Sequence, residues 1–535
     1  MLIRKPEAKE GLMAKQTKSI VGGMTILGMT GIICKLVGVL FSIPLTWLIG
    51  TDGLGIFQSV FPTYNLLLTV SSAGLPVAIS RMVSHCLAKD DPRNAKRVFR
   101  VALWLLAALG CICSLVMLVG SQQLTIIVDE PQSLLGFRVI APCVALVCIL
   151  SAFRGFMQGQ QNMVPTAMSQ LIEQVGKVFV SLPLAYMGSR IGIAEGAAGA
   201  LLGITIVEAL ALLYMVILYF RRRGTFDAIP QLSADAPIAT TTLGKRLMAI
   251  SIPITISACI VPLAQFVDST MLISRLMDAG IAREQARPLY GLFTGMVIRL
   301  INVPTALALS ISMSLVPAIS AAKALEDYNG IARQSDLGLR FAFLIGFPCS
   351  IGMSLLSENI ISFFYHETLT AAELQVSSQL LSMSSLTVVL FTVVQATSSI
   401  LQGLNKQRIP MYTLIAGVAC KIALNYILVG IPGINIHGAP IASIVCYSVS
   451  MLPNLYFVLK YGKMKFNWKG WVVRPGIATA AMGVVVWALR ELLPLNRFLT
   501  IAEIIIGVAV YIVVALAVKA VSLDDFKSFR RKKKA

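Results

Sequence analysis

The chain has 535 residues, of which 56% are hydrophobic and only 13% charged, and its mean hydropathy is +0.80. Soluble domains carry about 25% charged residues, so this chain has too few charges to cover a wetted surface. A soluble enzyme, a disordered chain and a disulfide-bonded secreted scaffold are therefore excluded. The composition indicates an all-α polytopic membrane protein.

Apolar stretches long enough to cross a bilayer as helices recur about 14 times along the chain. The first six are predicted at 20–49, 58–84, 98–120, 132–157, 165–187 and 194–220. The next six are predicted at 246–277, 288–318, 336–365, 374–402, 410–430 and 437–459, and two more at 471–492 and 498–520. We therefore expect an N-terminal segment 1–19, a six-helix bundle 20–220, a linker 221–245, a second six-helix bundle 246–459, two additional helices in 471–520 and a basic tail 521–535.

The formal net charge of +20 is concentrated in alternate loops. Basic residues cluster in the ranges 4–18, 89–100, 221–246, 460–469 and 527–534. Loops rich in Lys and Arg stay on the cytoplasmic side, so both termini are predicted to be cytoplasmic. This distribution explains the charge without nucleic acid as a partner. The basic tail is predicted to fix the orientation of the protein in the membrane. The alternative is that the tail contacts anionic lipid.

The two halves of the chain repeat short motifs. Ala78-Ile79-Ser80 returns as Ala318-Ile319-Ser320, and Gln158-Gly159 returns as Gln402-Gly403. An offset sustained at roughly 240–244 residues, with an even number of spans in each half, predicts two parallel repeats of the kind found in transporters. The alternative is an ancient duplication without a transport role.

Motifs for catalysis or metal binding are missing from the sequence. It has no P-loop pattern, and its three histidines have no metal-ligand spacing. Most of the ten cysteines fall inside apolar spans, where cysteine behaves as a small hydrophobe. We therefore expect no catalytic residue, no metal and no cofactor, with Na⁺ or H⁺ left as candidate coupling ions.

Two cations inside predicted spans point to an anionic substrate. Lys35 and Arg299 have no acidic neighbour within their own helices, and a charge in a span is costly unless it faces a wet cavity or a partner. Cations in a membrane cavity suit phosphate groups. The alternative is that they pair with a carboxylate elsewhere in the bundle, such as Glu208 or Asp268.

Other charges in the spans are predicted to be structural or to bind an ion. Glu173 and Lys177 are spaced i, i+4 and are expected to pair, while Arg154 is expected to reach the membrane interface. Asp268 and Lys421 are a candidate coupling pair, because an intramembrane carboxylate suits Na⁺ or H⁺ and a nearby ammonium could replace the ion.

The segments TILGMTGIICKLVGVLFSIPLTWLIGTDGLGIFQ and SAGLPVAISRMVS resemble the stage V sporulation protein B group, polysaccharide-biosynthesis exporters of the multidrug/oligosaccharidyl-lipid/polysaccharide (MOP) superfamily. ILQGLNKQRIP, KIALNYILV and GAPIAS resemble its second-half signature, and the resemblance covers roughly residues 20–460. It implies a fourteen-helix flippase for a lipid-linked sugar precursor, related to the lipid II flippases of peptidoglycan synthesis.

The resemblance also implies roles for single residues. Lys35 lies where the lipid II flippases carry an arginine on the first span, and Arg299, in RLINVP, matches their arginine on the eighth. Their arginine pair on the second span falls here on about Leu68 and Thr69, so a third cation is missing.

Their sodium site uses an aspartate on the seventh span and two polar residues on the eleventh. These positions fall on Asp268, Lys421 and Asn425. A lysine among them suggests that its ammonium takes the place of sodium, with a further substrate-binding cation as the alternative.

The expected function is thus export of lipid II or a related undecaprenyl-pyrophosphate oligosaccharide by alternating access, in contact with the bilayer and with cell-wall synthesis enzymes as further partners. A drug/cation antiporter of the same superfamily is the first alternative, although it would favour carboxylates in its cavity. The second is a membrane glycosyltransferase with Asp52 as its base.

Overall fold

The regular structure of the described chain is entirely helical. The computed structural model describes residues 6–89, 91–227, 238–492 and 497–520, and for some helical residues, Lys35 among them, it describes the backbone alone. Within these ranges, eleven helical stretches are long and apolar enough to cross a membrane. The predicted all-α polytopic membrane fold is confirmed, while the count of fourteen spans stays a prediction.

The chain forms two compact units, Met1–Ile273 (unit 1) and Ser274–Ala535 (unit 2), and passes from one to the other within α9. The bundle boundaries predicted from the loops stay a prediction. Unit 1 contains α1 (Pro6–Ser72), α2 (Leu75–Ala88), α3 (Pro92–Val119), α4 (Ser121–Ile127), α5 (Leu134–Gly159), α6 (Val164–Gly176), α7 (Leu182–Ser189), α8 (Ile193–Asp227) and most of α9 (Thr240–Asp278). A 3₁₀ turn, Pro131–Ser133, precedes α5, and a π-helical stretch, Lys177–Ser181, joins α6 to α7.

The start of the chain agrees with the expected break between the spans 20–49 and 58–84. Helix α1 consists of two helical stretches that meet at Gly50, whose φ of 68° and ψ of −175° lie outside the helical range. A further break lies between α1 and α2, where the Gly74 N–H donates to Thr255 Oγ1 of α9 over 3.1 Å. A Cβ on Gly74 would lie 2.2 Å from the Ser251 carbonyl oxygen, so the residue must be glycine for α9 to approach.

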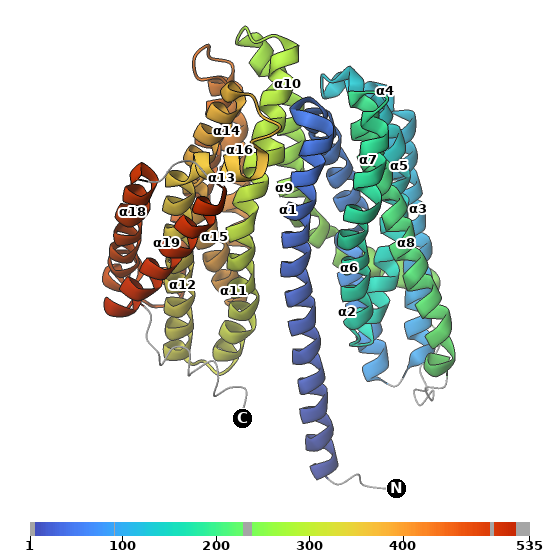
Figure 1. Cartoon of the computed structure of the whole chain (residues 1–535). Coiled ribbons are helices and arrows are strands. Elements are labelled where there is room, and N and C mark those ends of the chain that lie inside the picture. Colours follow the sequence, from blue (N-terminus) through green and yellow to red (C-terminus); the bar gives the residue numbers. More distant parts are fainter. Residues whose placement is uncertain (1–5, 90, 228–237, 493–496, 521–535) are drawn as a thin grey trace, which may run out of the picture. The chain divides into compact units, whose positions relative to one another are not determined.

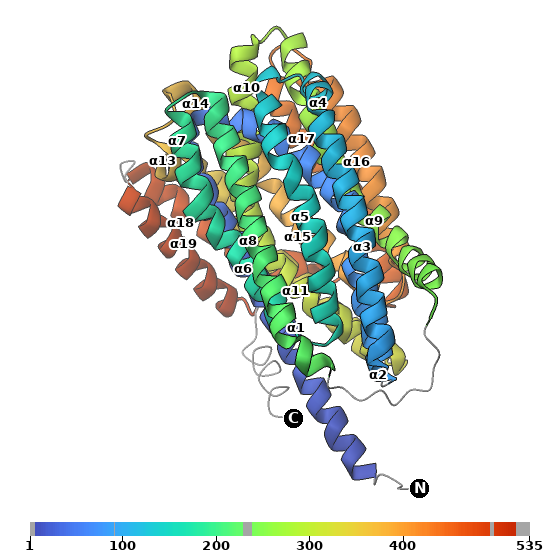
Figure 2. The same cartoon turned by 90° about the vertical axis from the view of Figure 1, so that its right-hand side faces the viewer.

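Helix α5 lies at the centre of unit 1. It packs against α1, α2, α3 and α8, and α3, α5 and α8 run side by side (Figures 1 and 2). Near the basic ends of α3 and α8, the Phe99 and Tyr219 rings lie 5.1 Å apart. The start of α3 and the end of α8 therefore lie at the same end of unit 1, as the alternation of basic loops predicts.

Unit 2 contains the end of α9 and the remaining helices. These are α10 (Arg283–Gly291), α11 (Ile298–Ala324), α12 (Tyr328–Leu355), α13 (Ser357–Tyr365), α14 (Ala371–Ser384), α15 (Leu386–Gly403), α16 (Arg408–Val429), α17 (Gly438–Tyr461), α18 (Arg474–Leu492) and α19 (Arg497–Ala517). A π-helical stretch, Leu292–Val297, joins α10 to α11, and another, Lys469–Val473, precedes α18. A 3₁₀ turn, Asn435–His437, precedes α17.

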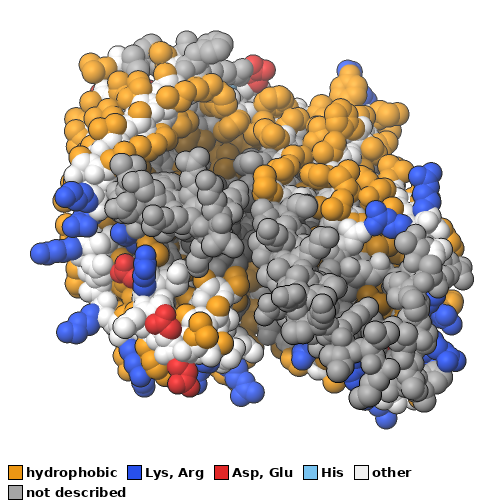
Figure 3. Space-filling view, turned by 90° about the horizontal axis from the view of Figure 1, so that it is seen from below, with side chains coloured by type: hydrophobic (Ala, Val, Ile, Leu, Met, Phe, Trp, Pro, Cys, Tyr) orange, Lys and Arg blue, Asp and Glu red, His pale blue; other side chains and the backbone are white. Residues whose placement is uncertain are grey.

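Three connections meet at one end of unit 2. The Lys323 ammonium, at the end of α11, donates to the Leu404 carbonyl after α15 over 2.6 Å. The Asp336 carboxylate of α12 accepts hydrogen bonds from Asn467 Nδ2 over 3.1 Å and Trp471 Nε1 over 2.8 Å. Figure 3 views the molecule from this side and shows Lys and Arg side chains projecting at its edge.

The repeated motifs occupy equivalent positions in the two units. In unit 1, a Cβ on Gly159 would lie 2.7 Å from Val83 Cβ, so α5 closely contacts α2. In unit 2, a Cβ on Gly403 would lie 2.9 Å from Ile319 Cβ, and Ser320 Oγ donates to the Gly403 carbonyl over 3.3 Å, so α15 closely contacts α11. The sequence repeat therefore corresponds to the same helix contact formed twice.

The two C-terminal helices dock on unit 2 through polar contacts. Asn359 of α13 donates from Nδ2 to Glu503 Oε2 of α19 over 2.8 Å, and the two residues are 4% and 1% exposed. Arg490 of α18 forms an ion pair with Glu358 of α13 at 2.9 Å. These contacts fix α18 and α19 against α12 and α13.

Candidate functional site

The two cations proposed to bind substrate lie on different units. Lys35 belongs to α1, and its side chain is outside the described residues, so its direction stays a prediction. Arg299 lies at the start of α11, directly after a π-helical stretch. It is partly buried and interacts electrostatically with Tyr365, at the end of α13. A π-helical turn often marks a functional position in a helix, which keeps Arg299 a candidate.

The proposed ion-binding residues are also divided between the units. Lys421 and Asn425 lie one turn apart on α16, where Asn425 is buried and Lys421 partly buried. At i, i+4 they share one face of the helix. Asp268 lies on the part of α9 that belongs to unit 1 and is 8% exposed. The Asp268–Lys421 pair therefore stays a prediction.

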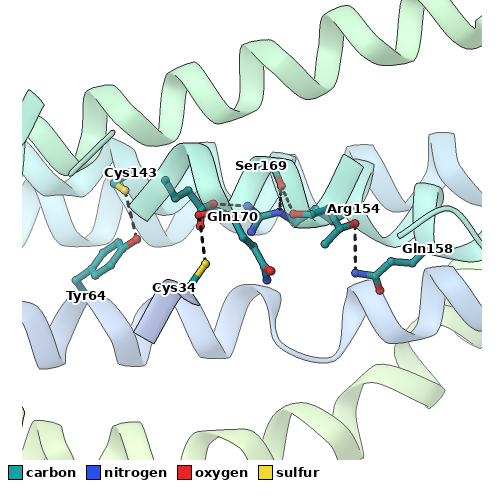
Figure 4. A network of polar contacts seen from close by, with 9 residues as sticks. Cys34, Tyr64, Cys143, Arg154, Gln158, Ser169 and Gln170 are labelled. Atoms are coloured by element: carbon teal, nitrogen blue, oxygen red, sulfur yellow. Dashed lines mark hydrogen bonds and ion pairs between the residues drawn. The ribbon is translucent and has the colours of Figure 1, made fainter. Parts of the chain in front are cut away.

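A polar network inside unit 1 joins α5 to α6. Arg154 of α5 forms an ion pair with Glu173 of α6, and its Nε donates to Ser169 Oγ over 2.9 Å (Figure 4). Ser169 Oγ in turn donates to the Thr166 carbonyl over 2.8 Å. The side chains of Arg154 and Glu173 are only 14% and 11% exposed. Arg154 is therefore held within the unit.

One sequence-based interpretation is wrong here. Glu173 pairs with Arg154 of α5 instead of with Lys177 on its own helix. The physical reason is that the guanidinium offers several donors in a planar fork, so one Arg154 side chain binds both Glu173 and Ser169. Arg154 and Glu173 lie on spans that are consecutive in the chain. This adjacency is the sequence feature that could have predicted their contact.

Further polar groups of unit 1 lie around this ion pair. Cys34 Sγ of α1 donates to the Gln170 carbonyl over 3.6 Å, and Tyr64 OH lies 3.3 Å from Cys143 Sγ (Figure 4). Glu208 of α8 is 5% exposed and interacts with Glu173. Glu208 was predicted only as a possible counter-ion for Lys35 or Arg299, and its interaction with Glu173 was not predicted.

The described residues contain no group of three or more His, Cys, Asp or Glu side chains arranged to hold a metal ion. What they do contain is a helical membrane protein built on a duplicated helix contact, with charged groups inside the spans. These features are typical of transporters built from two similar halves.

Residues 20–323 match the model of the polysaccharide biosynthesis protein family, and residues 253–427 match the MatE family. The chain belongs to the polysaccharide biosynthesis protein family. It is 28% identical to stage V sporulation protein B of Bacillus subtilis over 432 residues, covering 80% of this chain and 81% of that protein. It is 24% identical to the lipid II flippase MurJ of the same organism over 524 residues, covering 94% of each.

Solved structures with the same fold are transporters. A lipid II flippase MurJ in an inward closed conformation superposes with a TM-score of 0.69 at 14% identity, covering 92% of this chain and 98% of that one. An inward-facing MATE family transporter of the MOP superfamily superposes with a TM-score of 0.67 at 17% identity, covering 81% of this chain and 96% of that one. The predicted membership of the polysaccharide-biosynthesis family is confirmed, and the fold is that of these transporters. The glycosyltransferase alternative, with Asp52 as base, is thereby disfavoured.

Proposed function

We propose that this protein flips a lipid-linked sugar precursor, lipid II or a related undecaprenyl-pyrophosphate-linked oligosaccharide, across the cytoplasmic membrane by alternating access. The observation that carries the proposal is the end-to-end match with the lipid II flippase of Bacillus subtilis over 94% of both chains. The product would serve peptidoglycan, spore cortex or polysaccharide synthesis, in contact with cell-wall synthesis enzymes.

Lys35 and Arg299 are the proposed contacts for the pyrophosphate. Arginine binds phosphate oxygens through two parallel hydrogen bonds, and lysine binds them as a compact charge. In a weakly screened membrane cavity both attractions are stronger than in bulk water. A carboxylate at either position would repel the same group.

A drug/cation antiporter is the second candidate, since MATE transporters share the fold. The MATE structures align with 81% and 84% of this chain in two cases, whereas the lipid II flippase structure aligns with 92%. The flippase structure thus aligns with a larger part of this chain than either MATE structure does. Cations at the proposed site also disfavour a positively charged substrate.

Coupling is proposed to run without sodium. Lys421 would hold its ammonium where sodium-binding relatives hold the ion, close to Asp268 and beside Asn425. The alternative is that Lys421 contacts the substrate as a further cation. The double change Asp268→Asn with Lys421→Ala separates these roles, because rescue relative to Lys421→Ala indicates a pair and lack of rescue indicates separate roles.

Both termini are proposed to be cytoplasmic, in a bacterial cytoplasmic membrane, because the basic loops alternate along the chain. Single cysteines introduced at Asp235 and Asn496, two positions outside the described residues, test this in a variant lacking the native cysteines. Membrane-impermeant reagents should label them from opposite sides. Labelling from the same side contradicts the proposed topology.

Complementation of a lipid II flippase depletion strain tests the function. The unmodified chain should restore growth, whereas Lys35→Ala and Arg299→Ala should abolish rescue at normal membrane levels. Arg333→Ala is the matched control, because this arginine is exposed at the start of α12. Growth of both cavity variants would refute the anion site, and drug-dependent ion flux by the purified protein would support the antiporter.

A further inference from the structure

Helices α3 and α12 are equivalent elements of the two units, and each begins after a capping aspartate. Asp91 accepts a hydrogen bond from the Asn94 N–H over 3.0 Å at the start of α3. Asp327 accepts one from the Gly330 N–H over 2.9 Å at the start of α12. In both cases the carboxylate satisfies a backbone donor that the first helical turn leaves open. The residues of the two helices can therefore be compared by counting from these caps.

A close contact further along each helix agrees with this alignment. A Cβ on Gly110 of α3 would lie 2.7 Å from Cys148 Cβ of α5. A Cβ on Gly346 of α12 would lie 2.6 Å from Thr392 Oγ1 of α15. The two glycines lie at the same distance along the chain from the capping aspartate of their helix, and α5 and α15 both end in the repeated Gln-Gly motif. The equivalence of α3 and α12 thus extends to the helices against which they pack.

In unit 2, α18 and α19 pack against one face of α12 (Figure 1). At the basic end of this face, Asp336 accepts hydrogen bonds from the segment that leads into α18. Further along, the Tyr511 hydroxyl of α19 donates to the Leu344 carbonyl over 2.6 Å. At the other end, Arg490 of α18 donates to the Leu355 carbonyl over 3.0 Å. Polar contacts therefore hold the two helices along this face from end to end.

The equivalent face of α3 is exposed in unit 1. The positions that correspond to the three contact residues of α12 are Arg100, Ala108 and Val119, and all three are exposed. Trp104 and Leu115, which lie between them, are 73% and 59% exposed. Helices α1, α2, α4 and α5 pack against α3 from its other sides. We call these five exposed residues the α3 face.

The α3 face is as long as a membrane is thick. From Arg100 to Val119 the helix rises about 29 Å at 1.5 Å per residue, close to the ~30 Å of a bilayer core. An occupant that contacts the whole face must therefore cross the membrane. Near the centre of α3, Ala108 and Cys111 are smaller than the leucine and the phenylalanine at the equivalent positions of α12, so a helix backbone can approach closely.

The charge at the basic end of the face has opposite signs in the two units. Asp336 of α12 is an acceptor, and its partners on the way into α18 are donors. Arg100 of α3 is a donor with a permanent positive charge, so the occupant of the α3 face must supply an acceptor at this level. A carboxylate is the acceptor that also balances the charge at the edge of a membrane.

We propose that the α3 face is a docking site for a transmembrane helix of another membrane protein, and that this helix carries a carboxylate facing Arg100. The helix would occupy the position on α3 that α18 and α19 occupy on α12. The docking site does not depend on which substrate the chain transports.

Two other occupants are less compatible with the face. A second copy of this chain, docked through its own α3 face, has the same orientation in the membrane and would bring Arg100 against Arg100, which is repulsive. A lipid would leave the small residues at the centre of the face without a closely packed partner. On α12 the equivalent face is covered by helices, and this precedent within the same chain favours a helix on α3.

Photocrosslinking with synthetic transmembrane peptides tests the site. The full chain, in phosphatidylcholine vesicles, would carry benzoylphenylalanine in place of Trp104. The probe is a peptide of about 20 leucine and alanine residues with one glutamate near each end, so that either orientation presents a carboxylate to Arg100. A peptide with glutamine at both places is its control. The glutamate peptide should crosslink roughly 5- to 30-fold more, the range for one interhelical polar contact in lipid.

Benzoylphenylalanine in place of Phe179 is the matched control position. Phe179 is also an aromatic residue of unit 1 and is 73% exposed, but it lies in the π-helical stretch between α6 and α7. At this position the glutamate and glutamine peptides should crosslink equally. A preference for glutamate at both positions would show general attraction to a basic protein and would overturn the proposal.

Charge reversal tests the role of Arg100. Arg100→Glu should abolish the preference for the glutamate peptide and transfer it to a peptide with lysine at the same places. Arg333→Glu, at an exposed arginine near the start of α12, should leave the preference unchanged. If Arg100→Glu does not insert into the membrane, Arg100→Gln decides the test, because it should make the glutamate and glutamine peptides equivalent.

Three results would overturn the docking site. One is a preference for the glutamate peptide that survives in inserted Arg100→Gln. Another is an adduct with lipid alone at the Trp104 position in the presence of the glutamate peptide, which would identify a lipid-facing surface. The third is a crosslinked dimer of the chain, which would identify a second copy as the occupant.

Discussion

Arg154→Ala should strongly destabilise unit 1. The substitution removes the cation bound to Glu173 and the donor bound to Ser169 Oγ over 2.9 Å. Because the paired side chains are only 14% and 11% exposed, solvent can replace little of the lost interaction. Breaking a buried pair by removing one partner costs about 3–5 kcal/mol. At about 1.4 kcal/mol per factor of ten, the folded-to-unfolded ratio should fall roughly 10²- to 10⁴-fold.

A double-mutant cycle measures this coupling. The free energy of unfolding would be measured by denaturant titration in mixed micelles for Arg154→Ala, Glu173→Gln and the double variant. Glu173→Gln removes the charge that Arg154→Ala leaves uncompensated, so the double variant should recover most of the lost stability.

A more exposed ion pair in unit 2 provides the comparison. Arg490 and Glu358 are 36% and 40% exposed, so Arg490→Ala should cost only about 0–1 kcal/mol from the lost pair. Equal effects of Arg154→Ala and Arg490→Ala would refute the argument from burial. A double variant no more stable than Arg154→Ala would refute the pairing itself.

Three further predictions concern unit 2. Gly403→Leu should lower stability by about 1–3 kcal/mol through overpacking, since a bare Cβ would already lie 2.9 Å from Ile319 Cβ; an unchanged melting temperature contradicts this. Asn359→Leu removes the donor to the buried Glu503 carboxyl and should cost about 1.5–3 kcal/mol, with earlier proteolysis of α19, whereas equal protection from protease would refute the docking role. Lys421→Asn should make thermal stability or transport respond to Na⁺, and sodium-dependent transport by the unmodified chain would refute the replacement of sodium by the ammonium.

The membrane fold and the repeat were predictable because both depend on local patterns. Hydropathy over about 20 residues identifies a span whatever it packs against. The recurrence of Gln158-Gly159 as Gln402-Gly403 indicated equivalent positions, and the close glycine contacts explain why the motif is needed twice. The break at Gly50 was predictable as well, because the glycine-rich segment GTDGLG favours a turn between the first two spans.

The polar network of unit 1 was not predictable from spacing alone. The i, i+4 rule predicts a pair between Glu173 and Lys177 because they share a helix, but it does not consider an arginine on a facing helix. Glu208 was considered only as a counter-ion, and its burial depends on how closely the neighbouring helices pack against α8. For Lys35, Arg299 and Lys421, the sequence identified the charges, and their roles remain predictions.

The docking of α19 has a consequence for how the protein is made. Asn359 and its partner Glu503 are separated by 144 residues, so α13 is synthesised long before the carboxyl group that it binds. Until α18 and α19 have been inserted, Asn359 and Glu358 lack the partners that they have in the folded chain, and an unpaired polar group in a membrane is costly. A product truncated after α17 should therefore be less stable in lipid than the full chain.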